Sequence, residues 1–455
     1  MKRVLWICNI MLPVIGRELN LPYSNREGWL SGIFERIQKK EAPFELGICF
    51  PLGEADLAKV SGKLLGGGGA YRWQYKKEEM ARGKRLLVQD VDCYAFAENL
   101  GAPEIYDAQM ETVFKQIIED FAPDVIHIFG TEFPHTLSAV RAFDRPDRTL
   151  IGIQGLCSEI AKVYMAGLPV KVQKSVTFRD FIRRDSILRQ QEKFIRRGEN
   201  EVQALLKCGN ITGRTRFDRE GCARINPKAR YYPMNETMRA EFYTGKWSLT
   251  DCEEHSIFLG QGDYPLKGMH FALEALALLS PKYPDAKLYV AGNSILGHDT
   301  LKQKLKLPAY GKYLLFLIQK YHLESKVILL GKLDAEEMKR QFLKSSVFIC
   351  PSVLENSPNT IGEAKLLGVP VAASMAGGIP DMIEDGKDGL LFPVGDVKRM
   401  AEQIEVLWDR TQDGNGRCLA EYISEEARRK ARVIHDGEAN YLRLLEIYDK
   451  IEQNE

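Results

Sequence analysis

The sequence predicts an α/β protein of two doubly wound domains. Short apolar runs alternate with longer amphipathic segments from end to end, and a stretch rich in aromatic and turn residues near residues 231–250 divides this series in two. Continuous apolar runs, rather than strict alternation of apolar and polar residues, are typical of parallel strands covered on both faces. The spacing of strand, helix and strand indicates right-handed crossovers between parallel strands.

The predicted elements follow one another regularly. In the first half, strands are expected at Val4–Ile10, Glu45–Phe50, Val125–Phe129 and Leu150–Ile153. In the second half, strands are expected at Ile257–Gly260, Leu288–Ala291, Val327–Leu330, Val347–Cys350, Val369–Ala373 and Leu390–Phe392. Helices are expected among these later strands at Met269–Leu279, Asp334–Lys344, Thr360–Leu367 and Ile379–Glu384.

These elements suggest three parts of the chain. We expect a first domain at residues 1–235, a second at 250–425, and a C-terminal helix at 426–455 that crosses back to the first domain. Two doubly wound domains facing each other would form an interdomain cleft, which is the usual ligand site of such sheets.

Composition excludes several function classes. The chain has 455 residues, with 63 Lys and Arg against 62 Asp and Glu, so no overall field indicates a nucleic-acid partner. The nine cysteines are dispersed without a C-x-x-C pair or paired Cys/His spacing. This pattern favours buried thiols in a reducing cytoplasm over disulfides or a zinc site.

The N-terminus has some features of a signal peptide. Met1-Lys2-Arg3 precedes an apolar stretch, Val4–Ile15, but Asn9 and Pro13 interrupt it and no small-residue cleavage site follows. We therefore expect a buried first strand. No apolar run approaches the roughly 18 residues of a membrane span, so we expect a cytoplasmic protein.

The stretch from Pro351 to Asp396 is the most informative about chemistry. A buried strand ends at Cys350, Glu355 follows it, and a helix is expected to begin near Asn359 or Thr360. The free N–H groups of a helix N-terminus bind phosphate well. Glu363 lies eight residues after Glu355, so two carboxylates flank this helix start and would hold hydroxyl groups on both sides of a diphosphate.

At these residues the sequence resembles the retaining glycosyltransferases of family 4, which have the GT-B fold of two Rossmann-like domains. The E-x7-E motif is Glu355 and Glu363, and further motif elements follow in order at Gly368–Val371, Gly377–Asp381 and Asp385–Asp396. The resemblance implies that Glu355 contacts the donor sugar and that Glu363 holds the ribose hydroxyls. Donor contacts are also expected at the helix start: Ser357, Pro358, Asn359 and Thr360.

A second matching element is Gly260–Gly268. The family has an Arg and a Lys here that neutralise the donor diphosphate as it leaves. Lys267 matches the Lys, whereas the Arg position is the uncharged Gln261. Lys332 and Leu333 follow a predicted strand in a segment that resembles the one receiving the nucleobase.

The resemblance is fainter in the first half. Gly28, in Arg26-Glu27-Gly28-Trp29, resembles the glycine loop that lets a donor phosphate approach a helix. The family's D-V-x-H-x-H strand matches Asp124–Phe129, but Phe129 stands where the second His would lie beside the transferred sugar. His127 and His135 are the candidates to replace it, although a lone His on a buried strand is often a core residue.

The resemblance implies a retaining hexosyltransferase in polysaccharide or glycan biosynthesis. Its donor would be a nucleotide diphosphate sugar and its acceptor a carbohydrate, free or lipid-linked, with no metal and no further cofactor. Two alternatives stay open. One is a nucleotide-sugar epimerase of the same fold; the other is a non-catalytic sugar-nucleotide-binding scaffold, which Gln261 and Phe129 would explain.

Three other patterns bear on a metal site, a phosphate loop and a nicotinamide cofactor. Asp90-Val91-Asp92 reproduces a D-x-D metal motif, but the supporting features of the fold that uses it are missing. Gly66–Gly69 lacks the G-K-[ST] of a phosphate loop, so a flexible connection is expected. No G-x-G-x-x-G follows the first strand, which weakens a nicotinamide-cofactor interpretation.

Residues 162–197 are basic and interleaved with apolar side chains. Basic amphipathic helices bind anionic membrane surfaces, at about 1 kcal/mol per basic residue near the surface. One hypothesis is peripheral docking on the inner membrane face, where a lipid-linked acceptor would present its sugar. The alternative is a solvated helix pair that packs on the first domain.

Overall fold

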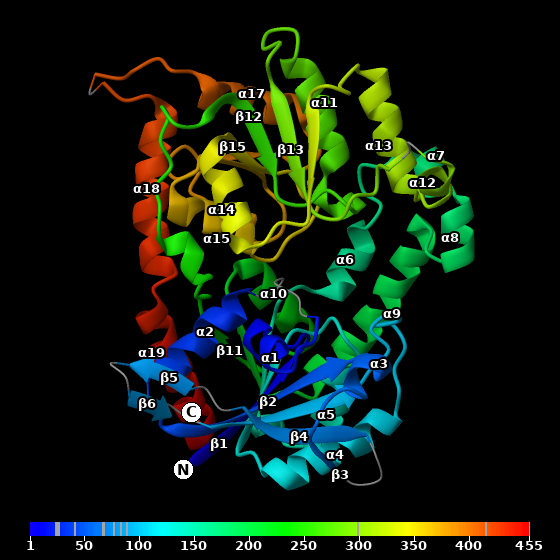
Figure 1. Cartoon of the computed structure of the whole chain (residues 1–455), viewed down its shortest axis with the longest axis vertical. Helices are drawn as coiled ribbons and strands as arrows, with labels where there is room; N and C mark the ends of the chain where they lie inside the picture. Colours follow the sequence, from blue (N-terminus) through cyan, green and yellow to red (C-terminus); the bar gives the residue numbers. More distant parts are fainter. Residues whose placement is uncertain are drawn as a thin grey trace. The chain divides into compact units, whose positions relative to one another are not determined.

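The computed structural model describes residues 1–22, 28–40, 42–65, 69–75, 78–81, 84–87, 90–297, 300–414 and 416–454. Arg26, Glu27 and Gly66–Gly68, which belong to motifs discussed above, lie outside these residues. The chain divides into two compact units (Figure 1). Unit 1 comprises Met1–Glu159, Lys193–Thr237 and Asp436–Glu455, and unit 2 comprises Ile160–Glu192 and Met238–His435.

Unit 1 contains a nine-stranded sheet in the order β11-β10-β9-β8-β1-β2-β7-β4-β3. The strands from β11 to β7 run parallel and are β1 (Lys2–Cys8), β2 (Phe44–Leu52), β7 (Val91–Ala97), β8 (Val125–Phe129), β9 (Thr149–Gly152), β10 (Asn210–Gly213) and β11 (Arg230–Pro233). β4 (Ala70–Tyr75) and β3 (Lys63–Leu65) add an antiparallel edge, and β5 (Glu78–Ala81) pairs separately with β6 (Lys84–Leu87). The chain order reverses between β8 and β1, which makes this the switch point of the sheet.

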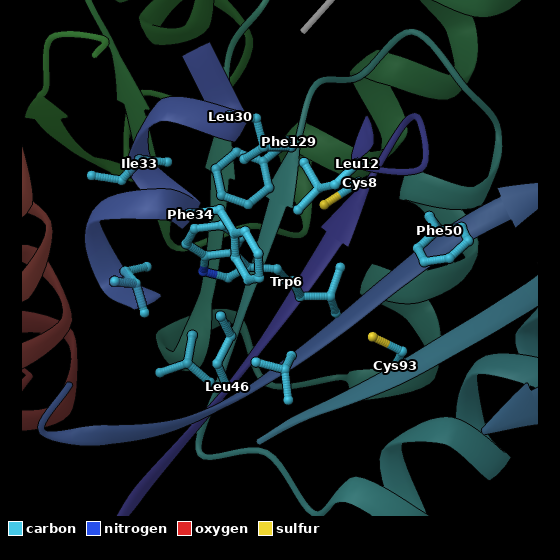
Figure 2. Packing of buried hydrophobic residues seen from close by; sticks show 14 of the residues in the cluster. Trp6, Cys8, Leu12, Leu30, Ile33, Phe34, Leu46, Phe50, Cys93 and Phe129 are labelled. Carbon is cyan, nitrogen blue, oxygen red and sulfur yellow. The ribbon is translucent and has the colours of Figure 1, made fainter. Parts of the chain in front are cut away.

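Strand β1 shows why this sheet is buried on both faces. Trp6 and Cys8 belong to one core cluster, whereas Leu5 and Ile7 belong to another. Successive side chains of a strand point to opposite faces, so the two clusters lie on the two sides of the sheet. Figure 2 shows the first of them, with Trp6 packed beside Phe34 and Phe129. The prediction of a buried first strand is confirmed.

The helices of unit 1 cover this sheet. They are α1 (Pro13–Glu18), α2 (Gly28–Lys39), α3 (Glu54–Leu57), α4 (Gln109–Phe121), α5 (His135–Phe143), α10 (Arg216–Ile225) and α19 (Gly437–Gln453). Two further helices begin in one unit and end in the other, α6 (Cys157–Val163) and α9 (Ile187–Leu206). The four strands predicted for the first half are present, whereas β3 to β7, β10 and β11 were not predicted.

Unit 2 contains a six-stranded parallel sheet in the order β14-β13-β12-β15-β16-β17. Its strands are β12 (Glu253–Leu259), β13 (Lys287–Ala291), β14 (Val327–Gly331), β15 (Ser345–Cys350), β16 (Val371–Ser374) and β17 (Leu390–Phe392). All six correspond to predicted strands, and the chain order reverses between β12 and β15. The expectation of two α/β domains with parallel sheets is confirmed.

The helices of unit 2 include those predicted and several others. They are α7 (Val170–Gln173), α8 (Phe178–Arg183), α11 (Met269–Leu279), α12 (Leu301–Leu305), α13 (Ala309–Lys320), α14 (Ala335–Lys344), α15 (Asn359–Leu367), α16 (Ile379–Met382), α17 (Val397–Trp408) and α18 (Leu419–Ile434). α14 packs against β12 and β15, and α11 packs against α17. Among the described residues, no helix is both long and apolar enough to cross a membrane.

The units differ from the predicted domain boundaries in two places. Residues 160–192 belong to unit 2, although 1–235 was expected to form one domain. The reason is local packing, since the Asp180 carboxylate accepts a hydrogen bond from the Ala309 N–H (2.9 Å). The C-terminal stretch is two helices, and only α19 belongs to unit 1, where the Tyr448 hydroxyl accepts a hydrogen bond from Trp6 Nε1 (2.8 Å).

Candidate functional site

The carboxyl ends of the unit 2 strands bring most of the predicted donor residues to one edge of the sheet. Gln261 and Lys267 follow β12, Lys332 follows β14, and Glu355 follows β15. β12 and β15 are neighbours at the point where the chain order reverses. Ligands of open parallel sheets bind outside the strand carboxyl ends at such a point. This edge is therefore the candidate site in unit 2.

Lys267 and Glu355 form an ion pair at this edge. Lys267 Nζ lies 2.5 Å from Glu355 Oε1, and the two side chains are 21% and 13% exposed. The same oxygen accepts a hydrogen bond from Ser352 Oγ (2.7 Å). Burial alone would lower the Lys267 pKa, but the Glu355 carboxylate outweighs it, so the pKa of Lys267 is raised. The ammonium group therefore stays charged across the physiological pH range.

Two glycines hold the loops of this pair against each other. Gly268 has φ +70°, and a Cβ there would lie 2.0 Å from the Pro351 carbonyl oxygen. Gly377 has φ +53°, and a Cβ there would lie 2.0 Å from the Glu355 carbonyl oxygen, which also accepts a hydrogen bond from the Gly378 N–H (3.0 Å). Only glycine permits such close backbone contact at positive φ. The approach of Lys267 to Glu355 is thus fixed by the backbone.

Glu363 accepts hydrogen bonds from Arg239, a residue that the sequence analysis did not indicate. Its Oε1 accepts hydrogen bonds from Arg239 Nε (2.9 Å) and Nη2 (2.6 Å), and its side chain is buried. Burial raises the pKa of Glu363, whereas the Arg239 guanidinium opposes this shift. Arg239 lies in the turn-rich stretch near 231–250, which has no periodic pattern from which its position could be predicted.

The start of α15 lies close to the end of β12. A Cβ on Gly260 would lie 3.3 Å from Thr360 Cγ2. Pro358 is the N-cap residue and provides no side-chain cap, and the first turn contains no acidic residue. Asn359 Oδ1 is buried without a hydrogen-bond partner among the described residues. The N–H groups of Asn359 and Thr360 in the first turn therefore suit an anion.

The Gln261 side chain belongs to a chain of hydrogen bonds with Asp263 and Asn293, and not with Lys267. Its Nε2 donates to Asp263 Oδ1 (2.8 Å), and Asp263 Oδ2 accepts from Asn293 Nδ2 (2.6 Å). A small recess lies beside this chain at the ends of β13 and β14, between Gly262 and Gly331. Lys332 is exposed just beyond the recess and Leu333 packs on the unit 2 core.

The two candidate histidines of unit 1, His127 and His135, have different partners. His127 is buried on β8, with Nδ1 2.8 Å from the Tyr448 hydroxyl, and burial lowers its pKa to about 3. His135 is fully buried at the start of α5, with Nδ1 2.9 Å from Glu98 Oε2. His135 lines a cavity of about 920 Å³ that Glu98 also lines. Gly28 is buried at the first position of α2.

A second recess of unit 1 contains residues that the sequence analysis missed. It is lined by His127 and Phe129 together with Arg214 and Glu236. Arg214 forms an ion pair with Glu236, and burial raises the pKa of Glu236 to about 7 although Arg214 opposes the shift. Arg214 directly follows β10, and Glu236 lies three residues after β11. Each of the two residues follows a parallel strand, and this position in the sequence could have indicated them as candidate site residues.

Metal-binding motifs gain no support from these contacts. Asp92, the second acid of the D-x-D tripeptide, lies in β7 and accepts a hydrogen bond from Arg72 Nη2 (2.9 Å). Within the part of the chain that the structure describes, no three His, Cys, Asp or Glu residues are grouped to hold a metal ion.

Comparison with known sequences identifies similar proteins. Residues 245–430 match the family described as Glycosyl transferases group 1. The sulfoquinovosyl transferase SQD2 of Arabidopsis thaliana is 29% identical over 143 residues, which are 31% of this chain and 24% of that protein. Spore coat protein SA of Bacillus subtilis (strain 168) is 26% identical over 187 residues, 41% of this chain and 46% of that protein. The chain thus spans about a quarter to a half of the length of these relatives.

Solved structures resemble the whole chain. Sucrose-phosphate synthase from Thermosynechococcus elongatus has a TM-score of 0.62 at 14% identity and covers 100% of both chains. Anabaena Alr3699/HepE in complex with UDP has a TM-score of 0.62 at 14% identity, covering 99% of this chain and 100% of that chain. At this identity the likeness concerns the fold. The resemblance inferred from the sequence is confirmed: residues 245–430 match the model of the group 1 glycosyl transferases, and the two α/β units of the chain have the GT-B fold.

Proposed function

We propose that this protein is a retaining glycosyltransferase that moves a hexose from a nucleotide diphosphate sugar to a carbohydrate acceptor, free or lipid-linked, in polysaccharide or glycan synthesis. The single observation that carries the proposal is the Lys267–Glu355 pair between the ends of β12 and β15. It is supported by glycosyltransferase relatives such as the putative colanic acid biosynthesis enzyme WcaL of Escherichia coli (strain K12), and by similar folds solved with UDP-glucose.

Lys267 would stabilise the leaving diphosphate. The raised pKa keeps its ammonium charged, and the N-terminus of α15 adds N–H donors for the same anion. Positive groups fixed where negative charge develops lower the barrier without reorganising during the reaction. The diphosphate would pair with the Lys267 ammonium in place of Glu355. The Glu355 carboxylate would then be available to accept hydrogen bonds from the sugar hydroxyls.

Glu363 would bind the ribose through its second oxygen. Both bonds from Arg239 go to Oε1, so we assign Oε2 to the ribose hydroxyls. Gln261, at the position of the family's Arg, would contribute no charge, which makes Lys267 the principal counter-charge at this edge. No cofactor besides the nucleotide sugar enters the proposal. His135, Glu98 and the cavity that they line are proposed for the acceptor side.

A non-catalytic sugar-nucleotide-binding protein is the second candidate. It is favoured by Gln261 and Phe129, which replace charged or proton-carrying residues of the family pattern. Such a protein would bind a donor without hydrolysing it or transferring its sugar.

The test begins with calorimetric titration of UDP-, GDP- and ADP-sugars. Bound donors are then incubated with and without candidate acceptors, and the products are analysed for sugar transfer and anomeric configuration. The proposal expects transfer with retention that is unaffected by a chelator. Binding without turnover favours the second candidate, conversion of the donor sugar without an acceptor indicates an epimerase, and no binding to any donor overturns the proposal.

A further inference from the structure

Residues 170–184 of unit 2 carry an unusual group of exposed apolar side chains. The exposed fractions are 61% for Val170, 55% for Val176, 62% for Phe178, 73% for Phe181 and 63% for Ile182. Single exposed apolar residues are common, but a concentration of large ones within fifteen residues marks an interaction surface. We call these residues with their charged neighbours the α7–α8 face.

The charges on this face are positive. Lys171, Lys174, Arg183 and Arg184 are exposed, and none of them forms an ion pair with a residue that the structure describes. Asp180, the acidic residue of this stretch, is buried; its carboxylate accepts hydrogen bonds from the Thr177 and Ala309 N–H groups and pairs with Arg179 (3.0 Å). The neighbouring helix α13 adds the exposed Lys312.

The face is held rigidly. Thr177 and Asp180 form a capping box at the start of α8, and Asp180 also accepts the hydrogen bond from Ala309 at the start of α13. Figure 1 shows α7 and α8 beside α13, and α7 contacts that helix. The exposed phenylalanines therefore belong to an ordered element, so binding through them would cost little conformational entropy.

We propose that the α7–α8 face docks on the surface of a lipid bilayer that contains anionic lipids. Phe178, Phe181 and Ile182 would enter the headgroup region, while Arg183 and Arg184 pair with lipid phosphates. Interfacial helices combine apolar side chains with Lys and Arg in this way. Charge complementarity selects a membrane over a protein of mixed charge, because four unpaired cations accompany the apolar residues without an exposed acid.

The α7–α8 face, residues 170–184, is only part of the segment 162–197 for which the sequence suggested membrane docking. Within 162–197, Arg197 donates from Nε to the Glu132 carbonyl oxygen (2.8 Å), and Arg189 pairs with Glu192 (2.6 Å). Arg189 and Arg197 therefore already have partners, and Arg179 pairs with Asp180 and Asp185, whereas Lys171, Lys174, Arg183 and Arg184 remain available. The inference does not depend on the proposed reaction, since docking is measured without donor or acceptor.

Vesicle flotation of the full chain tests the proposal. Vesicles of phosphatidylcholine are compared with vesicles containing about one-third phosphatidylglycerol, and binding is expected only to the latter and to weaken at high salt. Phe178→Ser/Phe181→Ser tests the apolar part. Arg183→Gln/Arg184→Gln tests the charged part and should reduce the partition coefficient about 30-fold, since each cation near an anionic surface contributes roughly a fivefold factor.

Arg432→Gln/Val433→Ser is the matched control, because it changes an exposed cation and an exposed apolar residue on α18 of the same unit. Circular dichroism confirms that each variant is folded. Absence of binding to anionic vesicles, or equal binding by the control and the α7–α8 variants, overturns the proposal. Sedimentation that shows a dimer lost in Phe178→Ser/Phe181→Ser would assign the face to a second copy and would also overturn it.

Discussion

Lys267 and Glu355, which are 88 residues apart in the sequence, meet at 2.5 Å between the ends of two neighbouring parallel strands. Neither charge is fully exposed, and both belong to loops that glycine backbones hold together. In the proposed function this cation and this acid exchange each other for the diphosphate and the sugar of the donor.

Lys267→Gln should reduce kcat about 100-fold with a smaller effect on KM, because it removes charge stabilisation that matters most as the diphosphate leaves. Steady-state kinetics with the donor identified by calorimetry provides the measurement. Lys344→Gln is the control, since Lys344 also pairs with an acid, Glu253 (3.3 Å), in unit 2. Equal kcat values for the two variants would remove Lys267 from the proposed chemistry.

Arg239→Gln should weaken donor binding, and more strongly at low pH. Burial raises the Glu363 pKa and Arg239 opposes this shift, so loss of the guanidinium should raise the pKa further and protonate Glu363 at a higher pH. The ratio of wild-type to variant donor affinity should therefore be larger at pH 6 than at pH 8. Calorimetry at both pH values measures it, with the exposed Arg340→Gln as the control. A ratio that is independent of pH would contradict the role given to Arg239.

His127 should make unit 1 less stable in acid. Its pKa in the folded protein, about 3, lies below the ordinary histidine value of 6.5, so the unfolded chain binds a proton first as the pH falls. The stabilising contribution is complete above pH 6.5 and is lost progressively from there towards pH 3. Urea unfolding of wild type and His127→Asn at pH 7.5 and 5.5 measures the effect. The wild type should lose about 1 kcal/mol more than the variant over this interval, and equal losses would disprove the assignment.

The sequence predicted the parts of this structure that follow a repeating pattern or a motif. The parallel strands of unit 2 were predictable because each is a continuous apolar run, and Lys267 and Glu355 because each follows such a strand within a motif. Arg239 was not, because its partner Glu363 lies 124 residues later in the sequence and the stretch near residues 231–250 has no periodicity. The assignment of residues 160–192 to unit 2 depends on tertiary contacts such as that of Asp180 with Ala309, which local pattern does not encode.

Gly377→Ala should disrupt the site by moving the Glu355 backbone. A Cβ at Gly377 would lie 2.0 Å from the Glu355 carbonyl oxygen, so the loop must shift and carry the Glu355 carboxylate away from Lys267. Gly386→Ala is a matched control, because Gly386 also has a positive φ (+76°) but a Cβ there meets nothing within 4 Å. The control should lose about 1 kcal/mol of stability from backbone strain, with normal donor affinity. Gly377→Ala should lose more stability and should bind donor at least tenfold more weakly, as measured by thermal unfolding and calorimetry. If both variants bind donor equally well, the position of Glu355 is not what the Gly377 contact maintains.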